Sequence, residues 1–171
     1  MEKKLESIFG NINDWLKFAE TKSATLIAFD GLVIFGILRI LKDVQLKSEH
    51  ELYVYIVITQ LIISLLIALT SLIPNLSMPW FFKKKQPSET DNLLYFEDIA
   101  KYTKSTYLHA LYQATGQEAR TITPYEKMMT HQIIVNSVIA RRKYKLFKLA
   151  IWVLLSAIVT PIGAFILFEI R

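Results

Sequence analysis

The polarity of the chain changes in long blocks, in which three apolar runs alternate with charged segments. The most uniform run covers residues 52–73 and reads LYVYIVITQLIISLLIALTSLI, without a single charge. A helix needs about 20 such residues to cross a hydrocarbon core about 30 Å thick. A chain of 171 residues is too short to bury a helix of that length that is apolar on every face. We therefore predict that this run spans a membrane.

Two further apolar runs, residues 23–41 and 149–168, complete a predicted set of three transmembrane helices. Pro74 follows the middle run and suits the end of a helix, because proline cannot continue a helix interior. Pro161 falls inside the last run, where it predicts a kink. The predicted fold is that of an all-α integral membrane protein.

Asp30 lies near the middle of the first run. An ionised carboxylate at that depth costs about 3 kcal/mol on insertion scales, so Asp30 must be neutral, paired or in contact with water. Gln60 and Ser64 of the second run are its expected partners. Three interpretations remain open: Asp30 lines a polar path or an oligomer axis, it makes a purely structural polar contact, or the limits of the run are misplaced.

Residues 1–22 have the apolar spacing of three and four that is typical of an amphipathic helix. The apolar positions are Leu5, Ile8, Ile12, Trp15, Leu16 and Ala19. Either this face packs on the soluble part of the same chain, or Trp15 and Phe18 lie in the lipid interface. In both cases we expect an N-terminal helix that precedes the first span.

Residues 75–148 mix charged and aromatic side chains and form the predicted soluble segment. We predict a helix over residues 105–116 that ends at Gly116, and a short strand or an irregular helical turn over residues 92–103. Thr123, Pro124 and Glu126 have the order of a capping box with proline at the first helical position. Nothing breaks the helix after Pro124 until Pro161, so one helix continues from the soluble segment into the last span.

The net charge is +5, and most lysines and arginines fall in residues 1–22 and 75–148. With three spans these two segments lie on the same side of the membrane, and their positive charge places that side in the cytoplasm. Basic side chains at the two ends of the soluble segment form a basic collar that we expect to face lipid phosphates. They are Lys83, Lys84, Lys85, Arg141, Arg142 and Lys143.

The candidate chemistry argues against an enzyme. The chain has no cysteine and only three histidines, which are far apart, and no metal-binding or phosphate-binding loop motif. No histidine or second carboxylate accompanies Asp30 inside a span to form an acid–base pair. We predict a non-enzymatic protein without a metal or other cofactor.

Four elements in order suggest a family. They are Glu20-Thr21-Lys22-Ser23-Ala24 at the first span, Asp30-Gly31 within it, NLLYF at residues 92–96, and Gln132, Ile133, Ser137, Ile139, Ala140, Lys143 and Tyr144 on the last helix. Together they resemble the Pycsar-type transmembrane effector family over nearly the whole chain. Two positions depart from the family pattern: Glu20 stands where aspartate is expected, and Glu97 where glycine is expected.

The resemblance implies a bacterial antiphage effector in the inner membrane. A cognate pyrimidine cyclase would produce cUMP or cCMP during infection, and the effector would bind it and impair the membrane, which causes abortive infection. The implied partners are this cyclic pyrimidine nucleotide, membrane lipids and further copies of the chain in a homo-oligomer, because three spans alone enclose no pore. No nucleic acid polymer is implied. The alternative is a small membrane scaffold that recruits a cytoplasmic partner.

A small anionic ligand needs aromatic faces for stacking and cations for its phosphate. The soluble segment offers Tyr95, Phe96 and Tyr102 for the first purpose, with Tyr107 and Tyr112 nearby, and Lys101, Lys104 and Arg120 for the second. The alternative is that the aromatic residues form the small core of this segment. A ligand held here would act on the membrane through the continuous last helix, provided that two states bind it with different affinity.

Overall fold

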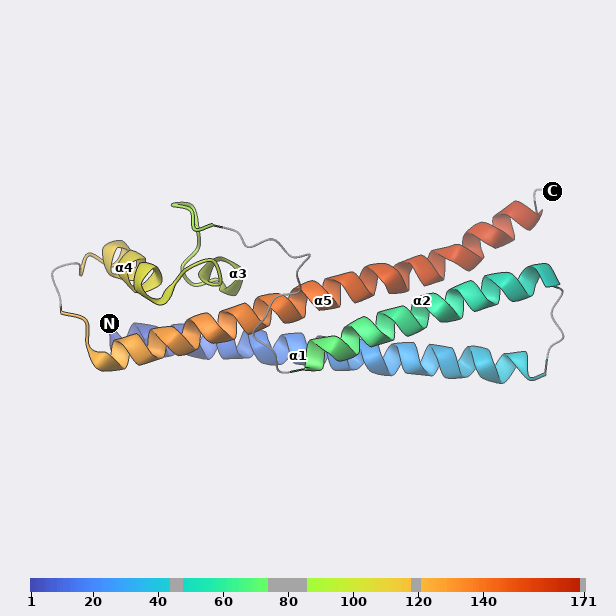
Figure 1. Cartoon of the computed structure of the whole chain (residues 1–171), viewed down its shortest axis with the longest axis horizontal. Coiled ribbons are helices and arrows are strands. Elements are labelled where there is room, and N and C mark those ends of the chain that lie inside the picture. The colour runs from blue at the N-terminus through green and yellow to red at the C-terminus, as the bar shows by residue number, and fades with distance from the viewer. Residues whose placement is uncertain (44–47, 74–85, 118–120, 170–171) are drawn as a thin grey trace. The chain divides into compact units, whose positions relative to one another are not determined.

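The computed structural model describes residues 1–43, 48–73, 86–117 and 121–169. Within them the elements are five helices (Figure 1): α1 (Glu2–Leu41), α2 (Ser48–Leu72), α3 (Phe96–Ile99), α4 (Lys104–Ala114) and α5 (Pro124–Glu169). Helices α1, α2 and α5 are each long and apolar enough to cross a membrane. The predicted all-α membrane fold with three spans is therefore confirmed.

The chain divides into two compact units. Unit 1 comprises Met1–Ala19 and Pro74–Tyr144, and unit 2 comprises Glu20–Ile73 and Lys145–Arg171. Helix α1 runs without interruption from the predicted N-terminal helix into the first predicted span, and α5 likewise continues past the basic collar. Both long helices therefore contribute residues to both units.

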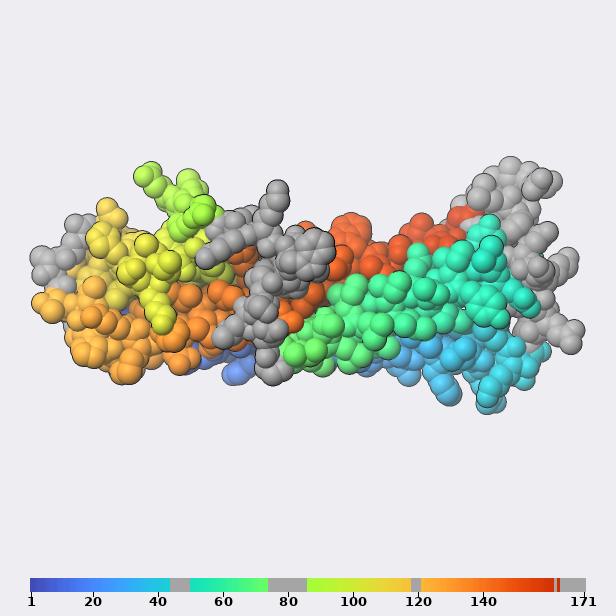
Figure 2. All heavy atoms as spheres, in the orientation of Figure 1, coloured from blue at the N-terminus to red at the C-terminus, as the bar shows by residue number. Residues whose placement is uncertain are grey.

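In unit 2, the second half of α1, all of α2 and the second half of α5 surround a narrow core. Its buried apolar members are mostly small or branched: Leu26, Leu61, Ala68, Ala150, Leu154 and Ala157. Large apolar side chains point outward instead, and Leu32, Phe35 and Trp152 expose 70%, 68% and 62% of their surface. Figure 2 shows the side chains of α2 on the outer surface of this unit. Small residues inside and large apolar residues outside are the arrangement expected of helices that face lipid.

In unit 1, the first halves of α1 and α5 lie side by side, with α3 and α4 packed against them (Figure 1). Asn136 Nδ2 donates a hydrogen bond to Asn13 Oδ1 over 2.7 Å, and so joins the two long helices. The buried face of α1 packs on the core of α3, α4 and α5 through Leu5, Ile8 and Ile12. The amphipathic pattern of residues 1–22 thus has a partner inside the same chain.

The ends of α4 and α5 follow from local sequence. Thr123 N–H donates to Glu126 Oε2 over 2.9 Å, and Glu126 N–H donates to Thr123 Oγ1 over 3.2 Å, which confirms the predicted capping box. Gly116 has φ +65°, a conformation that favours glycine, and it follows the end of α4 as predicted. Residues 92–103 contain turns and the single-turn helix α3. Of the two alternatives for this stretch, the helical turn is the correct one.

Candidate functional site

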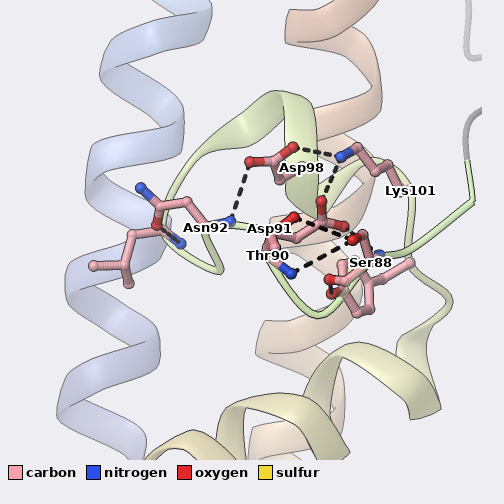
Figure 3. Close-up of polar contacts among 8 residues, drawn as sticks. Ser88, Thr90, Asp91, Asn92, Asp98 and Lys101 are labelled. Carbon is pink, nitrogen blue, oxygen red and sulfur yellow. Dashed lines mark hydrogen bonds and ion pairs between the residues drawn. The ribbon is translucent and has the colours of Figure 1, made fainter.

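A compact polar network precedes α4 (Figure 3). Lys101 Nζ lies 2.5 Å from Asp91 Oδ1 and 2.6 Å from Asp98 Oδ1, so one ammonium group bridges two carboxylates. The backbone N–H of Ser88 donates to Asp91 over 2.9 Å, and that of Asn92 donates to Asp98 over 3.1 Å. The network fixes the loop at residues 88–92 against the end of α3.

The charges within this network stabilise one another. Hydrogen bonds to Asp91 and then to Asp98 raise the pKa of Lys101. Burial acts to raise the pKa of Asp91, but hydrogen bonds from Lys101 and the Ser88 backbone outweigh it and bring that pKa below its usual range. Lys101 and Asp91 are therefore both charged at neutral pH. The charge of Lys101 is already balanced within the protein.

Next to the network, a cavity of about 570 Å³ opens between the loop and α4. Its lining combines an aromatic ring, small side chains and polar groups: Pro87, Ser88, Glu89, Asp91, Leu93, Tyr102, Ala110, Gln113 and Ala114. Pockets for small molecules typically measure about 300–1,000 Å³ and contain a few polar groups that orient the ligand. The cavity is thus large enough for a mononucleotide.

Tyr102 is the aromatic member of this lining. Its hydroxyl donates to the carbonyl of Ser88 over 3.3 Å, and its ring meets Tyr107 edge to face at 6.0 Å. Burial, followed by the charge of Asp91, raises the pKa of Tyr102, so the hydroxyl stays protonated at neutral pH. Tyr107 is fully buried and donates to the carbonyl of Leu93 over 2.7 Å, which anchors α4 to the loop.

The structure describes five of the six residues predicted to bind a ligand, and these five do not form one cluster. Of the five, Tyr102 alone lines the cavity, whereas Lys101 lies in the polar network and Lys104 is exposed at the start of α4. Phe96 is 3% exposed and belongs to the core, where its ring stacks on Tyr144 at 4.9 Å. Arg120 is outside the described residues.

Tyr95 belongs to the same aromatic group as Phe96. Its ring lies 4.7 Å from that of Phe96 and 6.2 Å from that of Trp15. Trp15 also contacts Tyr144, with 6.1 Å between the ring centroids. Trp15 is therefore packed against protein rings, while Phe18 is 50% exposed. Of the aromatic residues considered for ligand binding, Phe96, Tyr107 and Tyr112 belong to the buried core, as the alternative interpretation expected.

The predicted basic collar has a different environment from the one we expected. Arg141, Arg142 and Lys143 are only 4%, 6% and 4% exposed, so protein atoms enclose all three side chains. The reason is their position on α5, where this helix still packs within unit 1. Lys83, Lys84 and Lys85 are outside the described residues.

Polar side chains also meet inside unit 2. Ser64 Oγ lies 2.7 Å from Asp30 Oδ2, to which it donates, and 3.1 Å from the carbonyl of Ala150. Ser64 is thus the partner that we expected for Asp30, and both side chains are fully buried. Gln60, the other expected partner, instead donates to Ser156 Oγ over 3.2 Å. Asp30 therefore sits in a contact that connects all three helices of unit 2.

Gln113, Ser88 and Glu89 line the cavity but were not among the predicted site residues. Gln113 is a single amide in a short helix, and nothing in its sequence context distinguishes it. Ser88 and Glu89 lie on the loop that the pairing of Asp91 with Lys101 ties to the residues after α3. Their role in the lining depends on this pairing, which no local pattern reveals.

Comparison with known proteins gives consistent results over most of the chain. The family profile of the Pycsar effector protein domain, PycTM, matches residues 4–169. The chain is 33% identical over 143 residues to the Pycsar effector protein RsPycTM of a Rhizobium species, which covers 80% of this chain and 78% of the relative. It is 24% identical over 165 residues to the Pycsar effector protein PtPycTM of Propioniciclava tarda, which covers 95% of this chain and 74% of that one. No solved structure matches it.

Proposed function

The chain belongs to the Pycsar transmembrane effector family, and on this basis we propose that it binds a cyclic pyrimidine nucleotide and then impairs the bacterial inner membrane. The family consists of antiphage membrane effectors that a cyclic nucleotide triggers, and they are generally not enzymes. The finer proposal is that the ligand is cUMP or cCMP from a cognate cyclase. Membrane impairment would then stop growth before phage can spread.

The observation that carries this proposal is the sharing of two helices between the units. Helices α1 and α5 each supply residues to both units, whereas α2 belongs to unit 2 alone. A continuous helix can transmit a change in the packing of one unit to the other without a separate linker. Coupling of this kind requires two states that bind the ligand with different affinity.

For ligand binding we propose the cavity beside Tyr102. The Tyr102 ring offers a face on which a pyrimidine can stack, and the Gln113 side-chain amide can both donate to and accept from the edge of a base. Two carboxylates, Glu89 and Asp91, also line the cavity, so the phosphate is expected to lie away from them. Lys104 is two residues from Tyr102 and exposed, and we propose it as a contact for that phosphate.

A connection leads from α4 to the start of α5. The Tyr112 hydroxyl donates to Glu126 Oε2 over 2.6 Å, and the same carboxylate oxygen accepts the N–H of Thr123. Gln113, in the cavity lining, directly follows Tyr112 on α4. A ligand that shifts α4 would therefore act on the first turn of α5, and we propose this contact as the first step of the coupling.

The membrane arrangement is part of the proposal. The bias of lysine and arginine toward residues 1–22 and 75–148 supports a cytoplasmic location for unit 1. Three helices from one chain enclose no channel, so we propose that impairment requires a homo-oligomer. Asp30, held by Ser64 inside unit 2, is the candidate for a polar position that becomes exposed when the helices rearrange.

Binding can be tested directly. The detergent-purified protein and its variants Tyr102→Leu and Lys104→Gln are each titrated with cUMP, cCMP, cAMP and cGMP. Stacking of a base on an aromatic ring is worth about 1–3 kcal/mol, so we expect Tyr102→Leu to weaken pyrimidine binding by about 10-fold. Tyr125→Leu is the matched control, because Tyr125 is exposed and bonds to Glu6 away from the cavity. Equal binding of all four nucleotides, or of none, would contradict the proposal.

A further inference from the structure

Within unit 1, α5 carries a row of buried polar side chains on one face. Thr130, Ser137 and Arg141 are spaced by seven and four residues, which places them on the same side of a helix. Thr130 and Ser137 are 0% exposed and Arg141 is 4% exposed. The hydroxyl oxygens of Thr130 and Ser137 and the Nε and Nη2 atoms of Arg141 have no hydrogen-bond partner among the described residues.

The two Arg141 atoms are the important ones. The N–H groups of Nε and Nη2 point in the same direction and form the edge of the guanidinium that binds carboxylate or phosphate through two parallel hydrogen bonds. In Arg141 this whole edge is buried and faces no acceptor within the described part of the chain. The guanidinium of arginine keeps its positive charge in proteins, so this edge requires an acceptor.

A buried charge is costly unless an opposite charge compensates it. Among the described carboxylates of unit 1, Asp14 pairs with Lys17, and Asp91 and Asp98 pair with Lys101. None of these three pairs with Arg141. Neither Nε nor Nη2 of Arg141 meets an acceptor among the described residues, so an anion would be favoured beside this edge of the guanidinium.

Ser137 lies one turn before Arg141 on the same face, so its hydroxyl can supply a third donor beside the guanidinium edge. A phosphate ester has several oxygens for three donors and carries the negative charge that Arg141 needs. We propose that Arg141 and Ser137 form an internal binding site for a phosphate ester on α5. In this proposal, Arg141 binds a phosphate in an enclosed site, whereas the sequence predicted that it faces lipid at the surface.

Two sources can provide this phosphate: a free cyclic nucleotide or the headgroup of an anionic lipid. The first source rests on the proposed function and places a second nucleotide on α5, because Arg141 does not line the cavity beside Tyr102. The second does not depend on it. Arg141→Lys keeps the charge but removes the two-donor edge, and Ser137→Ala removes only the third donor. Lys127→Gln removes an exposed cation elsewhere on α5 and serves as the control.

In the first arm, binding of cUMP and cCMP to the detergent-purified full chain is measured by titration. In the second arm, thermal unfolding is compared in nanodiscs of phosphatidylcholine alone and of phosphatidylcholine with phosphatidylglycerol. If the site holds the phosphate of a nucleotide, Arg141→Lys should weaken the binding of cUMP or cCMP by at least 10-fold. If it holds a lipid headgroup, Arg141→Lys should abolish the shift in Tm that phosphatidylglycerol causes. Ser137→Ala is expected to have a smaller effect of about 3-fold, and Lys127→Gln none.

The outcomes separate the two proposals. If the unaltered chain binds no cyclic nucleotide but Arg141→Lys removes the phosphatidylglycerol effect, the anion site stands and the proposed function fails. If Arg141→Lys changes neither arm, the anion site is overturned, while selective pyrimidine binding keeps the proposed function.

A measurement on the unaltered chain covers the case in which the variants do not fold. Thermal unfolding of the unaltered chain is compared with and without added cUMP or cCMP, and with and without phosphatidylglycerol, and the phosphate ester that binds should raise Tm. A Tm that none of these phosphate esters changes would overturn the site.

Discussion

Lys101 holds together the polar network beside the cavity, and its loss should destabilise unit 1 by an amount that can be worked out. In Lys101→Met the carboxylates of Asp91 and Asp98 lose the ammonium that lies 2.5 and 2.6 Å from them. The Asp91 side chain is 4% exposed and that of Lys101 11%. Breaking a buried pair costs about 3–5 kcal/mol and an exposed pair contributes about 0–1 kcal/mol.

The network lies at the protein surface beside an open cavity, so we expect an intermediate cost of about 2 kcal/mol. For a domain of about 60–100 residues, 1 kcal/mol shifts Tm by about 4–8 °C. Lys101→Met should therefore lower the Tm of unit 1 by about 8–16 °C. Trp15 packs against Tyr95, Phe96 and Tyr144 in this unit, so its fluorescence can follow the unfolding of the detergent-purified chain.

The matched control is Lys17→Met. The pair of Lys17 with Asp14 has side chains that are 77% and 79% exposed, and its loss should cost less than about 0.5 kcal/mol. Equal shifts of Tm in the two variants, or no shift in Lys101→Met, would refute the assignment of structural importance to the network.

Further predictions concern pH, the helix cap, the interior of unit 2 and the anchoring of α4. The lowered pKa of Asp91 stabilises the fold above about pH 4, and this stabilisation is lost as the pH falls through the pKa of Asp91 in the folded protein. The raised pKa of Lys101 stabilises the fold below about pH 10, and this stabilisation is lost as the pH rises through the pKa of Lys101 in the folded protein. The contribution of this pair to Tm should be constant between these limits and decrease outside them, and Lys101→Met should weaken the decrease on the acid side. Thr123→Ala should cost about 1 kcal/mol in chemical unfolding, whereas Thr121→Ala, outside the cap, should not. Ser64→Ala should cost about 0.5–2 kcal/mol in detergent unfolding, and in an Asp30→Asn background its effect should shrink if the two side chains are coupled. Tyr107→Phe should cost about 1 kcal/mol and lower Tm, because the carbonyl of Leu93 loses a partly buried hydrogen bond. An unchanged Tm would contradict this.

Features that depend on local sequence were predictable. The three long apolar helices follow from hydropathy and length alone, and the capping box of Thr123 and Glu126 follows from three neighbouring positions. The pairing of Asp30 with Ser64 was also predictable, because the interior of a small helix bundle offers few polar partners to a carboxylate. The first half of α1 showed its buried face through spacing, even though its partners in α3 and α4 are about 90 residues away.

The candidate site was harder to predict because it depends on long-range packing. Aromatic composition alone could not separate Tyr102, in the cavity lining, from Phe96, in the core. From the sequence, Lys101 was a candidate to bind a phosphate. In the structure, Asp91 and Asp98 already balance its charge. Arg141 was expected at a lipid surface because basic residues next to a span usually lie there, whereas α5 still packs against protein at that position.

The central claim is that a cyclic pyrimidine nucleotide makes this protein impair a membrane. The most direct test is dye leakage from proteoliposomes that contain the purified full chain, with unit 1 accessible to added nucleotide. We predict leakage on addition of cUMP or cCMP, none with cAMP or cGMP, and a weaker response in Tyr102→Leu than in Tyr125→Leu. Liposomes that stay intact with both pyrimidine nucleotides, or that leak equally with all four, would contradict the account.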